Sequence, residues 1–388
     1  MSQTPSESGP ERDAGVSPAR PAGILPASGG DDPSSSSGRA NGANNAGETP
    51  ASREAPVPQA SLHDGLTSRT LLMYLLCLAG ATVGVLLLCT LFGQASLWDS
   101  GVWPMRLRRM LTAAIVGAAL STSGMALQGL LRNPLAEPYI LGVSSGAGVG
   151  VLMASFFTYV VGLTWLGTPA CALAGAGITC AAVYFIAQRR GRLDPYTLLL
   201  SGVIVNAFNG ALMLTLYLNV PPGEIVNFAT WSMGYITGTV KWTTFTFALV
   251  ALAGGWVALL LRGAHFNMLG LGDDVASSSG VRVQWLRIET FVLVSLMTAG
   301  AVAISGPIGF VGLIVPHICR LVVGPDHRRL ALVCGFAGAM FVMIGQTLCS
   351  LVGSWLSVGE LPVGILTALT GGPFFIYLLR KRRAKVEA

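Results

Sequence analysis

Ten apolar runs dominate the sequence, and a helix needs about 20 mainly apolar residues to cross the hydrocarbon core of a bilayer. The runs cover residues 70–93, 110–131, 139–161, 165–187, 196–219, 242–261, 288–306, 308–323, 330–353 and 361–379, of which the eighth is short. Charged residues make up only 11% of the chain and hydrophobic residues 52%, whereas a soluble domain carries about 25% charged residues. The sequence therefore predicts an all-α polytopic membrane protein with about ten transmembrane helices.

The first 68 residues have a different composition, rich in Pro, Ser, Gly and Asn, with eight acidic and four basic side chains. Such a segment cannot bury enough apolar surface to offset the entropy lost on ordering. It has no basic start followed by 7–15 apolar residues, so we do not expect a cleavable signal peptide. We predict a disordered cytoplasmic tail over residues 1–68 and a transmembrane domain over residues 69–388.

The basic residues predict the orientation, because short Lys- and Arg-rich loops stay in the cytoplasm. An even number of spans places both termini on one side, and the cluster from Arg380 to Lys385 makes that side the cytoplasm. The predicted inner loops hold Arg132, Arg189, Arg190, Arg192, Arg262, Arg282, Arg287, Arg320, Arg328 and Arg329. The only basic residue in the outer loops after spans 3, 5, 7 and 9 is Lys241. The stretch PMRLRRM at residues 104–110, between spans 1 and 2, is predicted to lie on the outer side, where its three arginines are an exception to this charge rule.

The predicted spans contain almost no charge, although ion-coupled pumps and carriers keep ionisable residues in the membrane. Their notable polar side chains are Gln128, Asn206 and Asn209, of which the last two share a helical face. These amides either form interhelical hydrogen bonds or line a polar pathway. No lysine stands in a phosphate-binding loop, so the chain is not expected to hydrolyse ATP by itself.

The sequence also argues against several other functions. Its basic residues lie singly or in short groups between apolar spans, which suits lipid headgroups rather than nucleic acid. The histidines and cysteines form no metal-ligand pattern, and no nucleophile, base and orienting group stand at an active-site spacing. We therefore expect no catalytic residue, no metal site and no cofactor.

Four stretches carry a family resemblance, and together they span about residues 70–380. They are RLRR followed by SGMALQGLLRNPLAEPYILGVSSGAG (106–148), LGLGDDVASSSGV (269–281), GPIGFVGLIVPHICRLVVGPDHRR (306–329) and ELPVGILTALTGGPFF (360–375). The chain resembles the FecCD/BtuC-type permease subunits of ATP-binding-cassette (ABC) importers for ferric siderophores, haem and vitamin B12. The resemblance implies a BtuC-like fold in the bacterial inner membrane and a permease domain over residues 69–388.

The resemblance also implies partners and site residues. A second permease copy would complete the pathway, two cytoplasmic ATPase subunits would supply the energy, and a periplasmic binding protein would deliver the cargo. The implied coupling helix that enters the ATPase contains Gly272, Asp273, Ala276 and Gly280. Its leading acids suit a helix N-terminus and its glycine suits a helix end, although an inert polar loop remains the alternative.

At the outer face, Arg106 and Arg109 resemble the arginines that pair with acids of the binding protein, with Arg108 as an aid. The alternative is that all three reach lipid headgroups. Tyr196 and Leu200, where the inner mouth narrows in the family, are gate candidates together with Gln128, Asn206 and Asn209.

Two departures from the family affect the expected docking surface. The family commonly reads D-T-L-A-R where this chain has residues 346–350 as QTLCS, so Gln346 and Ser350 replace an acid and an arginine. Arg108 stands where the family has a proline. The leading functional alternative, a gradient-driven secondary transporter or channel, lacks the charged relay that it would need; an intramembrane enzyme fits less well.

Overall fold

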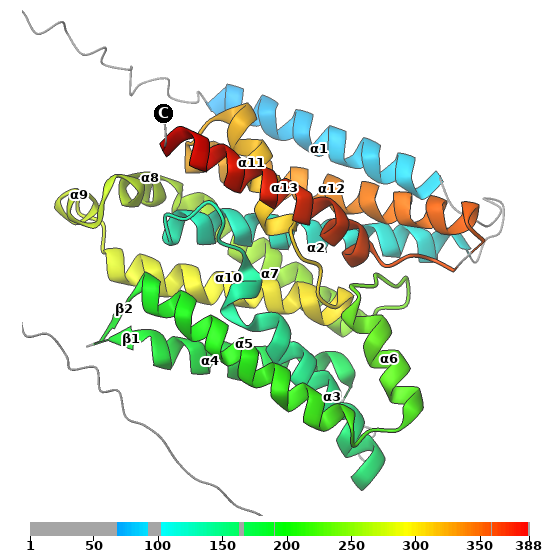
Figure 1. Cartoon of the computed structure of the whole chain (residues 1–388). Helices are drawn as coiled ribbons and strands as arrows, with labels where there is room; N and C mark the ends of the chain where they lie inside the picture. Colours follow the sequence, from blue (N-terminus) through cyan, green and yellow to red (C-terminus); the bar gives the residue numbers. More distant parts are fainter. Residues whose placement is uncertain (1–67, 92–101, 163–166, 190, 358, 387–388) are drawn as a thin grey trace, which may run out of the picture. The chain divides into compact units, whose positions relative to one another are not determined.

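Helices account for nearly all of the chain that the computed structural model describes, which comprises residues 68–91, 102–162, 167–189, 191–357 and 359–386. In chain order the elements are α1 (Ser68–Leu91), α2 (Val102–Leu130), η1 (Pro138–Leu141), α3 (Val143–Val161), α4 (Thr168–Ala187), β1 (Gln188–Arg189), β2 (Arg192–Leu193), α5 (Pro195–Tyr217), α6 (Pro222–Ser232), α7 (Trp242–Leu261), α8 (Gly263–Leu271), α9 (Asp273–Ser278), α10 (Val283–Ser305), α11 (Val311–Val323), α12 (His327–Trp355) and α13 (Val363–Val386). Figure 1 shows the long helices running roughly side by side.

Eight described helices are long and apolar enough to span a membrane: α1, α2, α3, α4, α5, α7, α10 and α12. Two shorter apolar helices, Val311–Val323 and Val363–Ile376, bring the number to ten. The prediction of an all-helical membrane protein with about ten apolar helices is confirmed. The short α6 and α8 and the two-residue antiparallel strands β1 and β2 were not predicted. The predicted tail falls on residues that lie, except for Ser68, outside the described ones.

The placement of PMRLRRM in a loop was wrong, because residues 104–110 lie within the first turns of α2. This helix has 29 residues, which corresponds to a length of about 44 Å. Since the hydrocarbon core is only about 30 Å thick, α2 is long enough to carry its arginines beyond the core without leaving the helical conformation.

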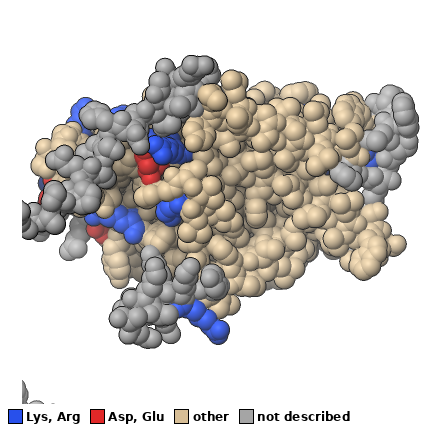
Figure 2. Space-filling model, turned by 90° about the horizontal axis from the view of Figure 1, so that it is seen from above, with Lys and Arg blue, Asp and Glu red and all other residues tan. Residues whose placement is uncertain are grey.

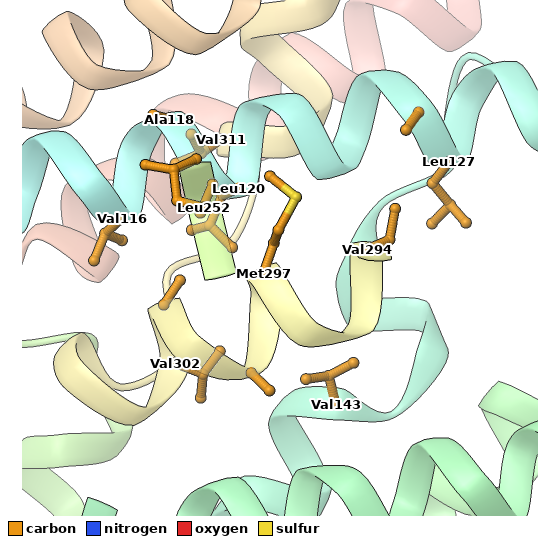
Figure 3. Close-up of a cluster of buried hydrophobic side chains, with 14 of the residues drawn as sticks. Val116, Ala118, Leu120, Leu127, Val143, Leu252, Val294, Met297, Val302 and Val311 are labelled. Atoms are coloured by element: carbon orange, nitrogen blue, oxygen red, sulfur yellow. The ribbon is translucent and has the colours of Figure 1, made fainter. Parts of the chain in front are cut away.

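The core of the fold surrounds α2. In the most apolar stretch of this helix, 89% of the residues are buried. It packs against α7, α10, α11 and α12. In Figure 3, Val294 and Met297 of α10 point toward α2, where Leu120 and Leu127 belong to the same buried cluster. Glycines permit the closest crossings: a Cβ placed on Gly124 would lie 2.0 Å from the backbone oxygen of Gly312 in α11.

Three glycines stand four residues apart at positions 142, 146 and 150, and two of them, Gly146 and Gly150, bring α3 and α4 close together. A Cβ on Gly150 would lie 2.0 Å from the backbone oxygen of Cys171, and one on Gly146 would lie 2.6 Å from that of Gly175. Gly142 has a different role, because its φ of +80° ends η1 in the left-handed region. The close α3–α4 pair therefore depends on Gly146 and Gly150.

The charged residues are distributed unevenly along the helix direction. α1 begins and α13 ends at the end of the molecule where α8, α9 and the β1–β2 hairpin lie (Figure 1). On the face shown in Figure 2, most Lys, Arg, Asp and Glu side chains gather at that same end, and the middle is largely uncharged. Below, this end is called the α9 end.

Candidate functional site: coupling, docking and pathway residues

The segment predicted to couple to an ATPase forms a short helix, α9, between two glycines with left-handed backbone. Gly272 has a φ of +135° and Gly280 a φ of +83°, so a side chain at either position would be strained. The first turn carries Asp273 and Asp274, as the sequence predicted. Because the segment is an ordered helix, it is not an irregular polar loop.

The two faces of α9 differ in accessibility. Ala276 is 0% exposed, so it seats α9 against the protomer and is not available to an external partner. The outward face instead presents Asp274 and the apolar side chain of Val275, which is 44% exposed. Sequence reasoning selected Ala276 and missed Val275, because a six-residue helix is too short for its periodicity to separate the two faces.

Asp273 fastens α9 to two long helices. Its carboxylate forms an ion pair with Arg132, just beyond the end of α2, and another with Arg287 of α10 at 2.7 Å. The Nε of Arg132 also donates to the backbone oxygen of Leu269 in α8, at 2.8 Å. The side chain of Arg287 is only 13% exposed, whereas those of Asp273 and Arg132 are 43% and 40% exposed. A displacement of α9 must therefore pull on α2 and α10 or break these bonds.

A second fastening joins α8 to the start of α12. The Nδ2 of Asn267 donates to the Oδ1 of Asp326 at 2.7 Å, and the backbone N–H of His327 donates to the Oδ1 of Asn267 at 2.9 Å. Burial opposes ionisation of Asp326, but the bonds from Asn267 and the Arg328 backbone, with the nearby arginine charges, hold the pKa of this carboxyl below its usual range. The α8–α9 segment is thus attached to the long helices at two points, Asn267 and Asp273.

At the opposite end of the molecule, the three arginines of PMRLRRM have different surroundings. Arg109 forms an ion pair with Glu360, whose other oxygen accepts a hydrogen bond from the Tyr235 hydroxyl at 2.9 Å. Arg108 donates to the backbone oxygen of Val240, and its guanidinium lies 4.4 Å from the ring centre of Trp242. Arg108 is thereby held within the protomer, so it is poorly placed to assist docking.

The Arg109–Glu360–Tyr235 group sets the electrostatics of this end. Burial opposes ionisation of Glu360, but the bond and charge of Arg109 and the bond from Tyr235 hold the pKa of this carboxyl below its usual range. Burial and the neighbouring Glu360 raise the pKa of the Tyr235 hydroxyl. The Arg109–Glu360 pair therefore stays ionised. Arg109 can reach an acid of another protein only by sharing its guanidinium with Glu360 or by leaving Glu360.

A cavity of about 390 Å³ lies beside this group, and its lining includes Arg106, Arg109 and the two residues of QTLCS that differ from the family pattern, Gln346 and Ser350. Gln346 is 1% exposed, and neither of its amide atoms has a hydrogen-bond partner among the described residues. Ser350 is smaller than the arginine that the family commonly has there, so it leaves room next to Arg106 and Arg109, and the neutral Gln346 places no carboxylate beside them.

Gln128 was a candidate for the pathway, and the structure places it inside the protomer at 3% exposure. Its Nε2 donates to the backbone oxygen of Gly312 at 3.1 Å, and its Oε1 accepts from Arg320 at 3.1 Å. One amide thus binds α2 to both ends of α11. This is the interhelical role that the sequence left open.

Asn206 and Asn209 of α5 meet at Ser145 of α3. The Ser145 hydroxyl donates to the Oδ1 of Asn206 at 2.6 Å and accepts from the Nδ2 of Asn209 at 3.0 Å. Asn209 also donates to Thr179 of α4 at 3.0 Å. Asn209 is buried within this network, whereas the half-buried Asn206 also lines a cavity between α3, α5 and α6.

Tyr196 and Leu200, the gate candidates, lie one helical turn apart near the start of α5. They are 76% and 49% exposed, so both face outward from the protomer. Phe208 continues this exposed apolar face farther along α5.

Sequence reasoning missed a pair of bonds that fix the loop between α10 and α11. The carboxylate of Glu137 accepts from the backbone N–H of Phe310, and the Tyr139 hydroxyl accepts from that of Ile308. Phe310 has a φ of +67°, which is unusual for a residue other than glycine. Glu137 and Tyr139 lie in the PLAEPY motif, but nothing in its spacing indicated partners about 170 residues away.

Comparison with known proteins supports the family resemblance along most of the chain. The family model described as the FecCD transport family matches residues 69–381. The chain is 42% identical over 285 residues to the cobalamin import system permease protein BtuC of Halobacterium salinarum, covering 73% of this chain and 74% of that protein. It is 35% identical over 321 residues to the hemin transport system permease protein HmuU of Yersinia pestis, covering 81% and 94%.

A solved structure agrees with the fold. It is described as an inward-facing conformation of a metal-chelate type ABC transporter, with a TM-score of 0.70 and 32% identity over 79% of this chain and 98% of that chain. The expected BtuC-like architecture is confirmed. The chain therefore belongs to the FecCD transport family, as a multi-pass membrane permease subunit of an ABC importer and not itself an enzyme.

Proposed function

We propose that two copies of this chain form the pathway of a binding-protein-dependent importer for an iron chelate, such as a siderophore or haem, or for cobalamin. Relatives named for cobalamin and hemin import support this range of cargo. Membership of the family implies an ATPase and a binding protein as partners. The second copy would complete a pathway beside the exposed apolar face of α5 that carries Tyr196 and Leu200.

The observation that carries the proposal is the construction of α9. A six-residue helix bounded by two glycines is anchored to the ends of α2 and α10 through Asp273, and it keeps the apolar Val275 exposed. An exposed apolar side chain on a firmly held short helix suits insertion into a groove of another protein. We assign this helix the role of the contact through which the ATPase moves the permease.

The same assignment gives the orientation. If α9 contacts a cytoplasmic ATPase, then the start of α1 and the end of α13, which lie at the α9 end (Figure 1), face the cytoplasm. The concentration of arginines in the loops at this end supports that direction. Both termini are then cytoplasmic, and Arg106 and Arg109 face the periplasm.

On the periplasmic side, Arg106 and Arg109 are assigned to docking of the binding protein. Arg106 lies half-buried at the edge of the 390 Å³ cavity, where Arg109 and Glu360 also lie. Arginine suits this role because its planar group can form two bonds to one carboxylate. Arg109 would reach an acid of the binding protein only by sharing its guanidinium with Glu360 or releasing it.

Copurification of the ATPase with permease variants tests the proposal. Val275→Glu places a charge on the exposed apolar position of α9, whereas the control Val275→Ile keeps that position apolar. We expect the Val275→Glu permease to lose the ATPase at unchanged membrane abundance and the Val275→Ile permease to retain it. Normal recovery of the ATPase with Val275→Glu would exclude α9 as the contact.

A further inference from the structure

Gln346 of α12 is a buried amide that makes no hydrogen bond to the rest of the protomer. Its side chain is 1% exposed, and neither its Oε1 nor its Nε2 bonds to any described residue. Gln128, the buried amide of α2, uses both of its polar atoms. A buried amide without a partner costs free energy, and native proteins tolerate few such groups. The Gln346 amide thus has an unused donor and an unused acceptor.

This amide lies in the wall of the cavity of about 390 Å³ next to the arginines of α2. The same lining includes Val102, the first residue of α2, and Met110, which are about 12 Å apart along the helix. The hydroxyl of Thr347, the residue after Gln346, meets the Sδ of Met110 at 3.9 Å. The cavity therefore extends from the start of α2, at the end opposite the α9 end, inward to the level of Gln346.

The charges around the cavity favour an anion. Among the described residues that line it, the charged side chains are Arg106, Arg109 and Glu360, and an excess of positive charge in a concave site attracts negative groups. Glu360 is held by Arg109 and by the Tyr235 hydroxyl, so it does not serve Gln346. A carboxylate that entered the cavity would accept a bond from the Gln346 amide with the charge of Arg106 nearby.

The residue at position 346 decides whether the cavity suits an acid. The family commonly has an aspartate here, whose negative charge would repel a second carboxylate. Gln346 is neutral, and its Nε2 carries two N–H donors. Ser350, one turn farther along α12, also lines the cavity and is smaller than the arginine that the family commonly has. Both differences from the family pattern make room for a carboxylate beside an amide donor.

We infer that this cavity is a pocket for one acidic side chain of the binding protein, and that the Nε2 of Gln346 donates a hydrogen bond to the inserted carboxylate. The inference rests on the proposed function and adds Gln346 to the docking residues Arg106 and Arg109. A carboxylate inside the pocket loses its hydration, so its bond to Gln346 acts mainly on the dissociation rate, whereas exposed rim charges act on association. Gln346 thereby selects a partner that presents a protruding Glu or Asp.

Docking kinetics of the binding protein on the permease–ATPase complex in nanodiscs test the inference. Gln346→Met keeps an unbranched side chain and removes the amide, and Gln346→Glu places a negative charge in the pocket. Lys241→Gln is the control, because it removes a basic group beside Trp242, the ring that Arg108 covers, and Lys241 does not line this cavity. The unfolding temperature of each complex is measured without the binding protein.

We expect Gln346→Met to raise the dissociation rate at least about tenfold, because a hydrogen bond to a charged group is lost, and Gln346→Glu to raise it further. Lys241→Gln should leave the dissociation rate unchanged. The unfolding temperature of the undocked Gln346→Met complex should stay the same or rise, since no bond is lost there. Replacing the acids of the binding protein one at a time by their amides should identify one acid whose loss has no further effect in the Gln346→Met background.

The inference is overturned if Gln346→Met dissociates at the wild-type rate, which would mean that the amide meets only solvent. It is also overturned if no single acid is coupled to Gln346, or if the undocked Gln346→Met complex unfolds at a lower temperature, because Gln346 would then have a structural role. Lost docking in the Arg106→Glu, Arg109→Glu double variant, with wild-type docking of Gln346→Met, would keep the proposed docking and exclude the pocket. Uptake that requires ATP and the binding protein would support the importer function in either case.

Discussion

The Asp273→Asn substitution keeps the size of the side chain and removes the charge that joins α9 to α2 and α10. Two ion pairs are lost, those with Arg132 and Arg287. Exposed ion pairs contribute about 0.2–1 kcal/mol each, and an acid at a helix N-terminus adds about 0.3–1 kcal/mol. The pair with Arg287 should contribute near the upper limit of this range, because the Arg287 side chain is only 13% exposed and would keep only a long bond to the Leu193 backbone oxygen. The free energy that holds α9 against α2 and α10 should therefore decrease by about 1–3 kcal/mol.

An energy of this size corresponds to a change of about 5- to 150-fold in the equilibrium between seated and displaced α9. The measurable quantity is the number of cargo molecules transported per ATP hydrolysed in proteoliposomes. We expect Asp273→Asn to lower this ratio severalfold, because ATPase motion would no longer be transmitted fully to α2 and α10. Asp273→Glu, which keeps the charge, should recover much of it.

Asp274→Asn is the matched control, because it removes an acid from the same turn of α9 and Asp274 makes no ion pair with any described residue. It should leave the transport ratio near the wild-type value. Equal losses in the two asparagine variants would mean that local negative charge, rather than attachment to α2 and α10, is what matters. That result would refute the reasoning.

Three further predictions concern docking, pH and packing. Replacing both Arg106 and Arg109 by Glu should slow association of the binding protein by at least about tenfold at low salt and by less at high salt, since screening weakens exposed charges; a wild-type rate would make these arginines lipid anchors. Because the pKa of Glu360 is held below its usual value of about 4.3, its pair with Arg109 stabilises the fold fully above that pH and less as the pH falls through the folded-state pKa. The difference in unfolding temperature between the wild type and Glu360→Gln should therefore shrink as the pH is lowered, and a constant difference would contradict the ion pair. Gly150→Val should destabilise the protein by about 3 kcal/mol, because a backbone oxygen blocks its Cβ, whereas Gly177→Val should have little effect on thermal unfolding.

The helices and α9 could be predicted from the sequence because their signals are local. A run of about 20 apolar residues has few alternatives to a membrane helix, and the described residues contain eight such helices and two shorter apolar ones. The pair of glycines at positions 272 and 280 marked the limits of α9, and each has a positive φ. These features depend on neighbours in the sequence and need no knowledge of the tertiary fold.

The site could not be predicted in the same way, because its partners are far apart in the sequence. Arg109 and Glu360 are separated by 251 residues, and no pattern links them. Gln128 is a polar residue in a predicted span, as a pathway residue would be, but its two hydrogen bonds to α11 make it a link between helices. PMRLRRM was placed in a loop because its charges interrupt the hydropathy, although a long helix can carry them beyond the hydrocarbon core.

Under the proposed function, this chain conducts cargo only when an ATPase drives it. The most direct measurement is uptake into proteoliposomes that contain the permease with its ATPase, with the binding protein outside and ionophores present to collapse ion gradients. We expect that cyanocobalamin, haemin or a ferric siderophore accumulates only when ATP and the binding protein are both present. Accumulation without ATP, driven by an imposed proton or sodium gradient, would contradict it.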